Sequence, residues 1–271
     1  MAYLKRSEAD VKLYYRTRGE GPPLLLINGL SQSVANWTTQ ASRLKDKFRV
    51  IMYDGRGQGR SGLGNQPLSL DTHVDDVIAL LDHLEIDSAY VVGFSHGGRV
   101  GLRLAAEHPE RVSKLVITGQ GADNEPTRHV TLRVWKEVLR LGGAEALAWC
   151  SVVDILSPDY LRLHADQLDV MIRTTVQRNT TEGLTAMLDA LLEYPPSLDD
   201  AARVQCPTLV CSADQDPLCS ERAARRLVRK IPGARHVRFA DCGHTIPIEQ
   251  PHRWRTEVEA FWDRPAPVSA S

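Results

Sequence analysis

The chain has 271 residues, of which 42% are hydrophobic and 25% charged. This length and composition are typical of one globular domain, or of a core domain that carries one insertion. The 33 basic and 34 acidic residues leave a formal net charge of −1, without the basic excess of nucleic-acid-binding proteins. No apolar run reaches the ~20 residues that a transmembrane helix needs. We therefore expect no nucleic-acid partner and no membrane span.

The N-terminal segment and the cysteines favour a cytoplasmic location. Residues 1–19, MAYLKRSEADVKLYYRTRG, lack the apolar segment of a secretory signal. The cysteines are odd in number and widely spread, unlike a disulfide framework, and their spacing fits no zinc site. We expect free thiols and no metal. The five positions are Cys150, Cys206, Cys211, Cys219 and Cys242.

Short apolar segments alternate with helical patterns along the chain. Residues 2–6 and 11–17 alternate in polarity, which predicts an antiparallel hairpin at a sheet edge. Runs that are apolar on both faces, as in buried parallel strands, follow at 24–27, 50–53, 90–92, 114–118, 208–211 and 236–239. Helices are expected at 71–84, 95–108, 221–230 and 252–262. This order predicts an α/β fold with a doubly wound, mostly parallel sheet of eight strands.

The alternation stops between residues 123 and 201. Helical patterns occupy 130–141, 144–155, 158–177 and 181–192, and no strand pattern is found there. A crossover between parallel strands needs far fewer residues. We predict a helical lid at 123–201, inserted into a core formed by 1–122 and 202–271. The alternative is a set of ordinary crossover helices within the core.

Ser95 is the candidate nucleophile. It lies in Gly93-Phe94-Ser95-His96-Gly97-Gly98, between a predicted strand and a predicted helix, which is the context of a nucleophile elbow. Small residues on both sides of the serine let strand and helix approach closely. The N-terminus of the helix directs free N–H groups at an anion that forms beside Ser95.

A serine needs a base, and the base needs an orienting carboxylate. Of nine histidines, His244 follows the last predicted strand. It is therefore expected beyond the carboxyl ends of the parallel strands, where Ser95 is also expected. Asp216 and Asp214 both follow the preceding strand, and we favour Asp216. The order Ser, Asp, His is the order of this type of triad.

The oxyanion hole needs two N–H donors. One is the backbone N–H of His96, directly after the nucleophile, and the second is expected from Leu30 in the loop after strand 24–27. Asn28, Gly29 and Phe94 are expected to line the same site, as is the side chain of His96. The alternative for residues 28–31 is a plain strand-ending turn.

With these motifs, the chain resembles the α/β-hydrolase superfamily, in the branch with a lid after the sixth strand. The resemblance rests on DGRGQGRS (54–61), GFSHGG (93–98), PTLVCSADQDP (207–217) and GHTIPIEQP (243–251). It implies triad roles for Ser95, Asp216 and His244, and oxyanion roles for Leu30 and His96. The chain departs from the family in having Asn28-Gly29 where His-Gly is usual.

The resemblance implies a serine hydrolase that cleaves an ester, thioester or lactone through an acyl-Ser95 intermediate, without a cofactor. The expected substrate is a small acyl molecule, free or carrier-bound. Two alternatives stay open. Asn28-Gly29 also resembles acyltransferases that join 3-hydroxyacyl chains, and a binding module without catalysis exists on the same fold. The oligomeric state is not encoded in any of these patterns.

Overall fold

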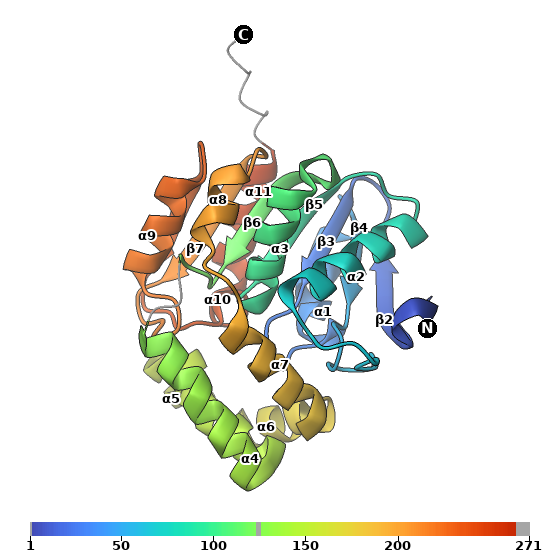
Figure 1. Cartoon of the computed structure of the whole chain (residues 1–271). Coiled ribbons are helices and arrows are strands. Elements are labelled where there is room, and N and C mark those ends of the chain that lie inside the picture. The colour runs from blue at the N-terminus through green and yellow to red at the C-terminus, as the bar shows by residue number, and fades with distance from the viewer. Residues whose placement is uncertain (1, 123–125, 264–271) are drawn as a thin grey trace.

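A computed structural model describes residues 2–122 and 126–263 (Figure 1). Its centre is an eight-stranded sheet with the order β1-β2-β4-β3-β5-β6-β7-β8. At one side of the sheet, β1 pairs with β2 and β2 pairs with β4, both antiparallel. Every other pair, from β4 to β8, is parallel, as predicted. The strands are β1 (Ala2–Arg6), β2 (Val11–Arg18), β3 (Pro23–Ile27), β4 (Arg49–Tyr53), β5 (Ala89–Phe94), β6 (Val112–Thr118), β7 (Thr208–Ala213) and β8 (Arg235–Phe239).

Helices cover both faces of the sheet, which explains why the central strands are apolar throughout. Along β3, Leu25 and Ile27 pack into the core on one face, and Leu24 and Leu26 pack into the core on the other. The first face is covered by α2 (Leu70–His83), α3 (His96–Glu107) and α9 (Glu221–Lys230), and the second by α1 (Thr38–Leu44) and α11 (Pro251–Trp262). The predicted doubly wound α/β architecture is confirmed.

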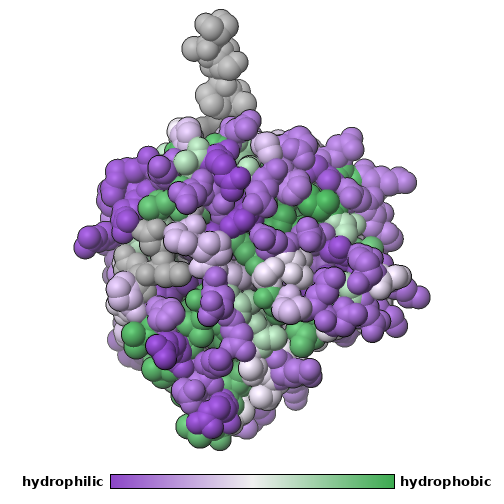
Figure 2. All heavy atoms as spheres, viewed as in Figure 1, coloured by the Kyte–Doolittle hydropathy of each residue, from purple (hydrophilic) through white to green (hydrophobic). Residues whose placement is uncertain are grey.

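A group of helices between β6 and β7 projects from one end of the sheet (Figure 1). We call these helices the insertion: α4 (Pro126–Ile155), α5 (Pro158–Leu163), α6 (Leu168–Gln177) and α7 (Thr181–Glu193). Several exposed apolar side chains lie on it, and Figure 2 shows hydrophobic residues over these helices. They include Val130, Val134, Leu141, Trp149, Val153, Leu163 and Val170. No helix in residues 2–122 or 126–263 is long and apolar enough to cross a membrane.

Two features of the insertion differ in detail from the predicted helices. The single helix predicted at 158–177 is wrong: α5 ends at Leu163, and a short 3₁₀ turn at Ala165–Gln167 precedes α6. In contrast, the predicted break between 141 and 144 exists as a kink inside α4, where Gly143 has φ 72°. Residues 123–125, where the predicted insertion begins, lie outside the described residues.

Several short helices had no clear periodicity in the sequence. These are α1, α8 (Leu198–Arg203), α10 (Ile246–Glu249) and the 3₁₀ turn Val34–Trp37 before α1. α8 packs against α3 and α9, so the expected boundary at residue 201 falls within a helix that contacts the core.

Candidate active site

Ser95 occupies a strained turn between β5 and α3. Its φ of 52° and ψ of −116° are unusual for a residue with a side chain. This conformation explains why α3 begins at His96 and not at Ser95, as the predicted helix 95–108 had it. A β-carbon at Gly93 would collide with the carbonyl of Gly97, and one at Gly97 would collide with the carbonyl of Ile27. The two glycines therefore permit the close approach that places Ser95 at the turn.

The position of Ser95 in the sheet is also distinctive. β3 lies between β4 and β5, so the chain leaves β3 toward one side of the sheet and later returns on the other. Ligands of open parallel sheets bind at such a switch point, beyond the carboxyl ends of the strands. Ser95 follows β5 and Leu30 follows β3, so both lie at this point.

His244 and Asp216 form a buried pair at the same end of the sheet. The Nδ1 atom of His244 lies 2.7 Å from Oδ2 of Asp216. The other oxygen, Oδ1, accepts the backbone N–H groups of Leu218 and Cys219 at 2.8 and 2.9 Å. These contacts leave Nε2 of His244 as the ring nitrogen that can face a substrate.

Asp214 has a different task. Its Oδ1 accepts the backbone N–H of Cys242 at 3.3 Å, and its Oδ2 accepts a hydrogen bond from Arg238 at 3.1 Å. The carboxylate therefore ties the loop after β7 to the loop after β8. Of the two aspartates, Asp216 is the one that contacts the imidazole.

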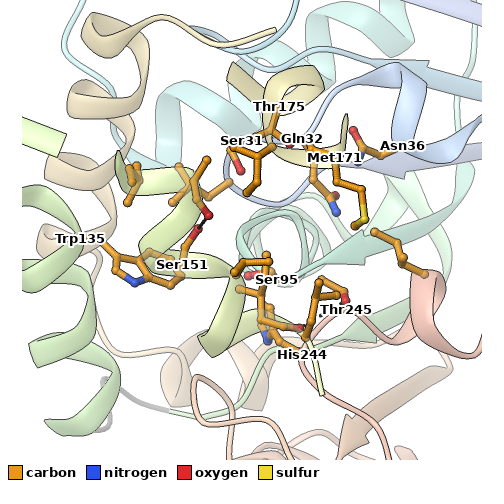
Figure 3. A pocket seen from close by; sticks show the side chains of 18 of the residues that line it. Ser31, Gln32, Asn36, Ser95, Trp135, Ser151, Met171, Thr175, His244 and Thr245 are labelled. Atoms are coloured by element: carbon orange, nitrogen blue, oxygen red, sulfur yellow. Dashed lines mark hydrogen bonds between the residues drawn. The ribbon is translucent and has the colours of Figure 1, made fainter. Parts of the chain in front are cut away.

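Ser95 and His244 line one cavity, closed on its other side by the insertion (Figure 3). The cavity encloses about 1020 Å³, counting open space at its mouth. No hydrogen bond within 3.5 Å joins the Ser95 hydroxyl to His244 among the described residues, and such bonds are often long before substrate binds. The insertion supplies lining residues from α4, α6 and α7: Trp135, Ala144, Leu147, Ala148, Ser151, Val152, Ile155, Met171, Ile172, Thr175 and Leu184.

The expected oxyanion donors lie at the two loops that flank Ser95. Leu30 lines the cavity, and His96 is the first residue of α3. No hydrogen bond joins the N–H of either residue to another residue in the described part of the chain. Both N–H groups are therefore available to an oxyanion beside Ser95.

Three residues lie elsewhere than expected. Phe94 lines the cavity, but Asn28 and Gly29 are buried and do not line it. Asn28 is buried and donates from Nδ2 to the carbonyl of Tyr53 at 2.8 Å. The His96 side chain also points away from the cavity, since α3 directs it toward His73 and Tyr194. Its burial lowers its pKa well below the usual value, so this imidazole stays neutral.

Two residues that support the site were not singled out in the sequence. Gln58 is buried and donates from Nε2 to the carbonyl of Gly29 at 2.8 Å. Asn179, from the insertion, donates from Nδ2 to the carbonyl of Ser31 at 2.9 Å. Gln58 lies within the segment 54–61 that carries the family resemblance, so that motif was the available signal. No sequence signal marked Asn179.

The chain is similar to known proteins over most of its length. Residues 22–251 match the model of the alpha/beta hydrolase fold family. The chain is 29% identical to 3-oxoadipate enol-lactonase 2 of Acinetobacter baylyi, over 94% of each protein. It is 30% identical to a Caulobacter sp. (strain K31) protein named as a carbamate hydrolase, RutD, over 92% of this chain and 95% of that protein.

The solved structures include a close structural match. The enol-lactonase from Burkholderia xenovorans LB400 superposes with a TM-score of 0.86 at 28% identity, covering 97% of this chain and 100% of that one. The family match extends over most of the chain and includes Ser95, Asp216 and His244, together with the strands that precede them. This chain is therefore a hydrolase that belongs to the alpha/beta hydrolase fold family.

Proposed function

We propose that the chain hydrolyses a carboxylic ester, thioester or lactone through an acyl-Ser95 intermediate. One observation carries the proposal: the buried His244–Asp216 pair opens onto the same cavity as a serine held at a strained strand-to-helix turn. This set of groups supplies a nucleophile, a base and an orienting carboxylate. The names of the enol-lactonase relatives support a lactone as one form of substrate.

The proposed reaction has two steps. Ser95 Oγ attacks the carbonyl carbon while Nε2 of His244 takes the hydroxyl proton, and the N–H groups of Leu30 and His96 stabilise the oxyanion. His244 then donates that proton to the leaving group, at the oxygen of an alcohol or the sulfur of a thiol. In the second step, His244 takes a proton from water, the hydroxide attacks the acyl carbon, and Ser95 leaves with the proton. Asp216 stabilises the imidazolium in both steps.

We propose the segment 123–201 as a lid over this site. Support comes from the insertion, which forms much of the cavity wall while the catalytic candidates come from core loops. The partner is a small-molecule acyl substrate, and attachment to a carrier is compatible with a cavity that opens to solvent. We further propose a cytoplasmic location, supported by five cysteines that are all free, four of them buried.

A panel of substrates tests the proposal. It contains p-nitrophenyl esters and acyl thioesters of rising chain length together with simple lactones. We expect the wild type to turn over at least one substrate and Ser95→Ala to lose about 10³-fold or more in kcat. Ser212→Ala serves as the control, since Ser212 is a buried serine of β7 that contacts His236. Equal activity of wild type and Ser95→Ala would overturn the proposal.

A further inference from the structure

The wall of the cavity carries almost no charge. Among the described residues, the lining contains no lysine, arginine, aspartate or glutamate, and His244 is its one histidine. The part formed by the insertion is mostly apolar. Six side chains dominate that part: Trp135, Leu147, Val152, Leu156, Ile172 and Leu184.

The few polar groups of this apolar part are already engaged. The hydroxyl of Ser151 donates to the carbonyl of Ala148, and the hydroxyl of Thr175 donates to the carbonyl of Met171. The indole N–H of Trp135 donates to Asp154 at 2.8 Å. A carboxylate placed here would lose its water without gaining a donor or a cation, which is costly in free energy.

The opposite side of the cavity is polar but uncharged. Gln32 and Asn36 come from the segment after β3 and lie away from Trp135 and Ser151, on the side of the cavity where Met171 lies (Figure 3). The side-chain oxygen of Gln32 accepts the N–H of Gly29, and that of Asn36 accepts the N–H of Ser33. These two bonds fix which end of each amide is oxygen, so the NH₂ groups remain as neutral donors at the mouth.

From this arrangement we infer that the acyl part of the substrate is apolar and uncharged, and that it lies beneath the insertion. The leaving-group part then faces Gln32 and Asn36 and carries a neutral hydrogen-bond acceptor such as an ether, amide or ring oxygen. This inference rests on the proposed function, because only the proposed hydrolysis defines an acyl part and a leaving-group part of the substrate. It separates this chain from hydrolases whose acyl substrate bears a second carboxylate.

Two ligands that differ by one carboxylate test the inference. Binding of methyl hexanoate and monomethyl adipate to Ser95→Ala is measured by calorimetry, which needs no turnover. We expect the adipate ester to bind about 100-fold more weakly, since its terminal carboxylate would be desolvated. In the wild type, kcat/KM for p-nitrophenyl hexanoate and mono-p-nitrophenyl adipate should show the same preference.

A charge placed in the wall provides the complementary test. Ser151 is half-buried and lines the cavity beside Trp135 (Figure 3), so Ser151→Lys should strengthen adipate binding about tenfold or more, while the neutral control Ser151→Gln should not. Equal binding of the two esters to Ser95→Ala, or binding of neither, overturns the inference. Selective binding of methyl hexanoate without any turnover by the wild type upholds the inference and overturns the proposed hydrolysis.

Discussion

Asp214 and Asp216 are separated by one residue, but their carboxylates serve different partners. Asp216 contacts Nδ1 of His244, and Asp214 contacts the N–H of Cys242 and the side chain of Arg238. We expect Asp216→Asn to lower kcat by about 10³- to 10⁴-fold, because the amide no longer selects the useful tautomer or stabilises the cation. Asp214→Asn should change kcat less than about tenfold, since the loop keeps a similar acceptor. Steady-state kinetics decide, and a larger loss in Asp214→Asn would reverse the assignment.

Gln58 contacts the peptide that carries the N–H of Leu30, one of the two proposed oxyanion donors. The carbonyl of Gly29 and the N–H of Leu30 belong to one planar peptide, so a hydrogen bond to that carbonyl orients the N–H. Gln58 makes this bond at 2.8 Å from a buried position. The same bond polarises the peptide and strengthens the N–H as a donor. We therefore predict that Gln58 is a positioning residue for the proposed oxyanion hole.

We expect Gln58→Glu to lower kcat about tenfold to a hundredfold with little change in KM, because its carboxylate cannot donate to the Gly29 carbonyl. Affinity for a trifluoromethyl ketone, which forms an oxyanion, should fall with kcat. Gln40→Glu is the matched control: Gln40 is equally buried and donates to the carbonyls of Pro247 and Pro251. If both variants lose the same activity, Gln58 has a merely structural role.

The catalytic candidates could be predicted because their chemistry constrains local sequence. A serine at this strained turn requires small residues nearby, and Gly93 and Gly97 in the sequence indicate such a turn. The side-chain direction of His96 could not be predicted, because it depends on the rotation of α3 against Tyr194 and His73. Likewise, Asn28 carries no local signal that it binds the Tyr53 carbonyl 25 residues away.

At the scale of elements, the insertion contacts the core through a pair of glycines. A β-carbon at Gly57 would lie 3.0 Å from Cα of Gly183 in α7, and one at Gly183 would collide with the Gly57 carbonyl. The two backbones thus touch directly. Nearby, Asn179 donates to the carbonyl of Ser31, in the loop of residues 28–31 that follows β3. The position of α7 is therefore coupled to the loop that carries Leu30.

Gly183→Ala tests this contact. Alanine in a helix normally adds up to about 1 kcal/mol of stability relative to glycine. Here the collision with Gly57 should instead lower the free energy of unfolding by about 1–3 kcal/mol and raise KM, as α7 shifts away from the cavity. Urea denaturation and kinetics measure both effects. Gly62→Ala is the control, since a β-carbon at Gly62 would meet Val11 at an ordinary 3.6 Å. A Gly183→Ala protein that is more stable than the wild type would show that Gly57 and Gly183 do not pack this closely.

Helices and strands differed in how well they could be predicted. The central strands are apolar on both faces because both faces are covered, so each appeared as a short run such as 114–118 within β6. The break at 163–168 was missed because the apolar spacing continues across it, whereas Gly143 marked the kink in α4. α1 was missed because its seven residues, TTQASRL, are too few to show a period.

At the scale of the whole molecule, the core beneath α3 contains polar groups that must be paired or neutral. Arg56 and Asp76 form a buried ion pair at 2.6 Å, and Arg99 joins Asp200 at the same distance. Asp76 also pairs with Arg6, and Asp200 also pairs with Arg103 and Arg203. Removal of either aspartate would therefore leave a buried arginine without its carboxylate. His73 and His96 are buried as well, but among the described residues neither forms an ion pair with a carboxylate, and burial lowers the pKa of both, so they stay uncharged.

His73 makes the stability of the fold sensitive to acid. It is buried with Nε2 unpaired, and desolvation lowers its pKa to about 4. The unfolded chain, with a pKa near 6.5, binds a proton between about pH 6.5 and 4 that the folded chain does not. The free energy of unfolding should therefore fall as the pH falls, by about 2 kcal/mol from pH 7 to pH 5 for His73 alone.

Urea denaturation at both pH values measures this fall. His73→Leu should reduce it, while His252→Leu, at an exposed position on α11, should not; an unchanged slope in His73→Leu would assign the acid sensitivity to other groups.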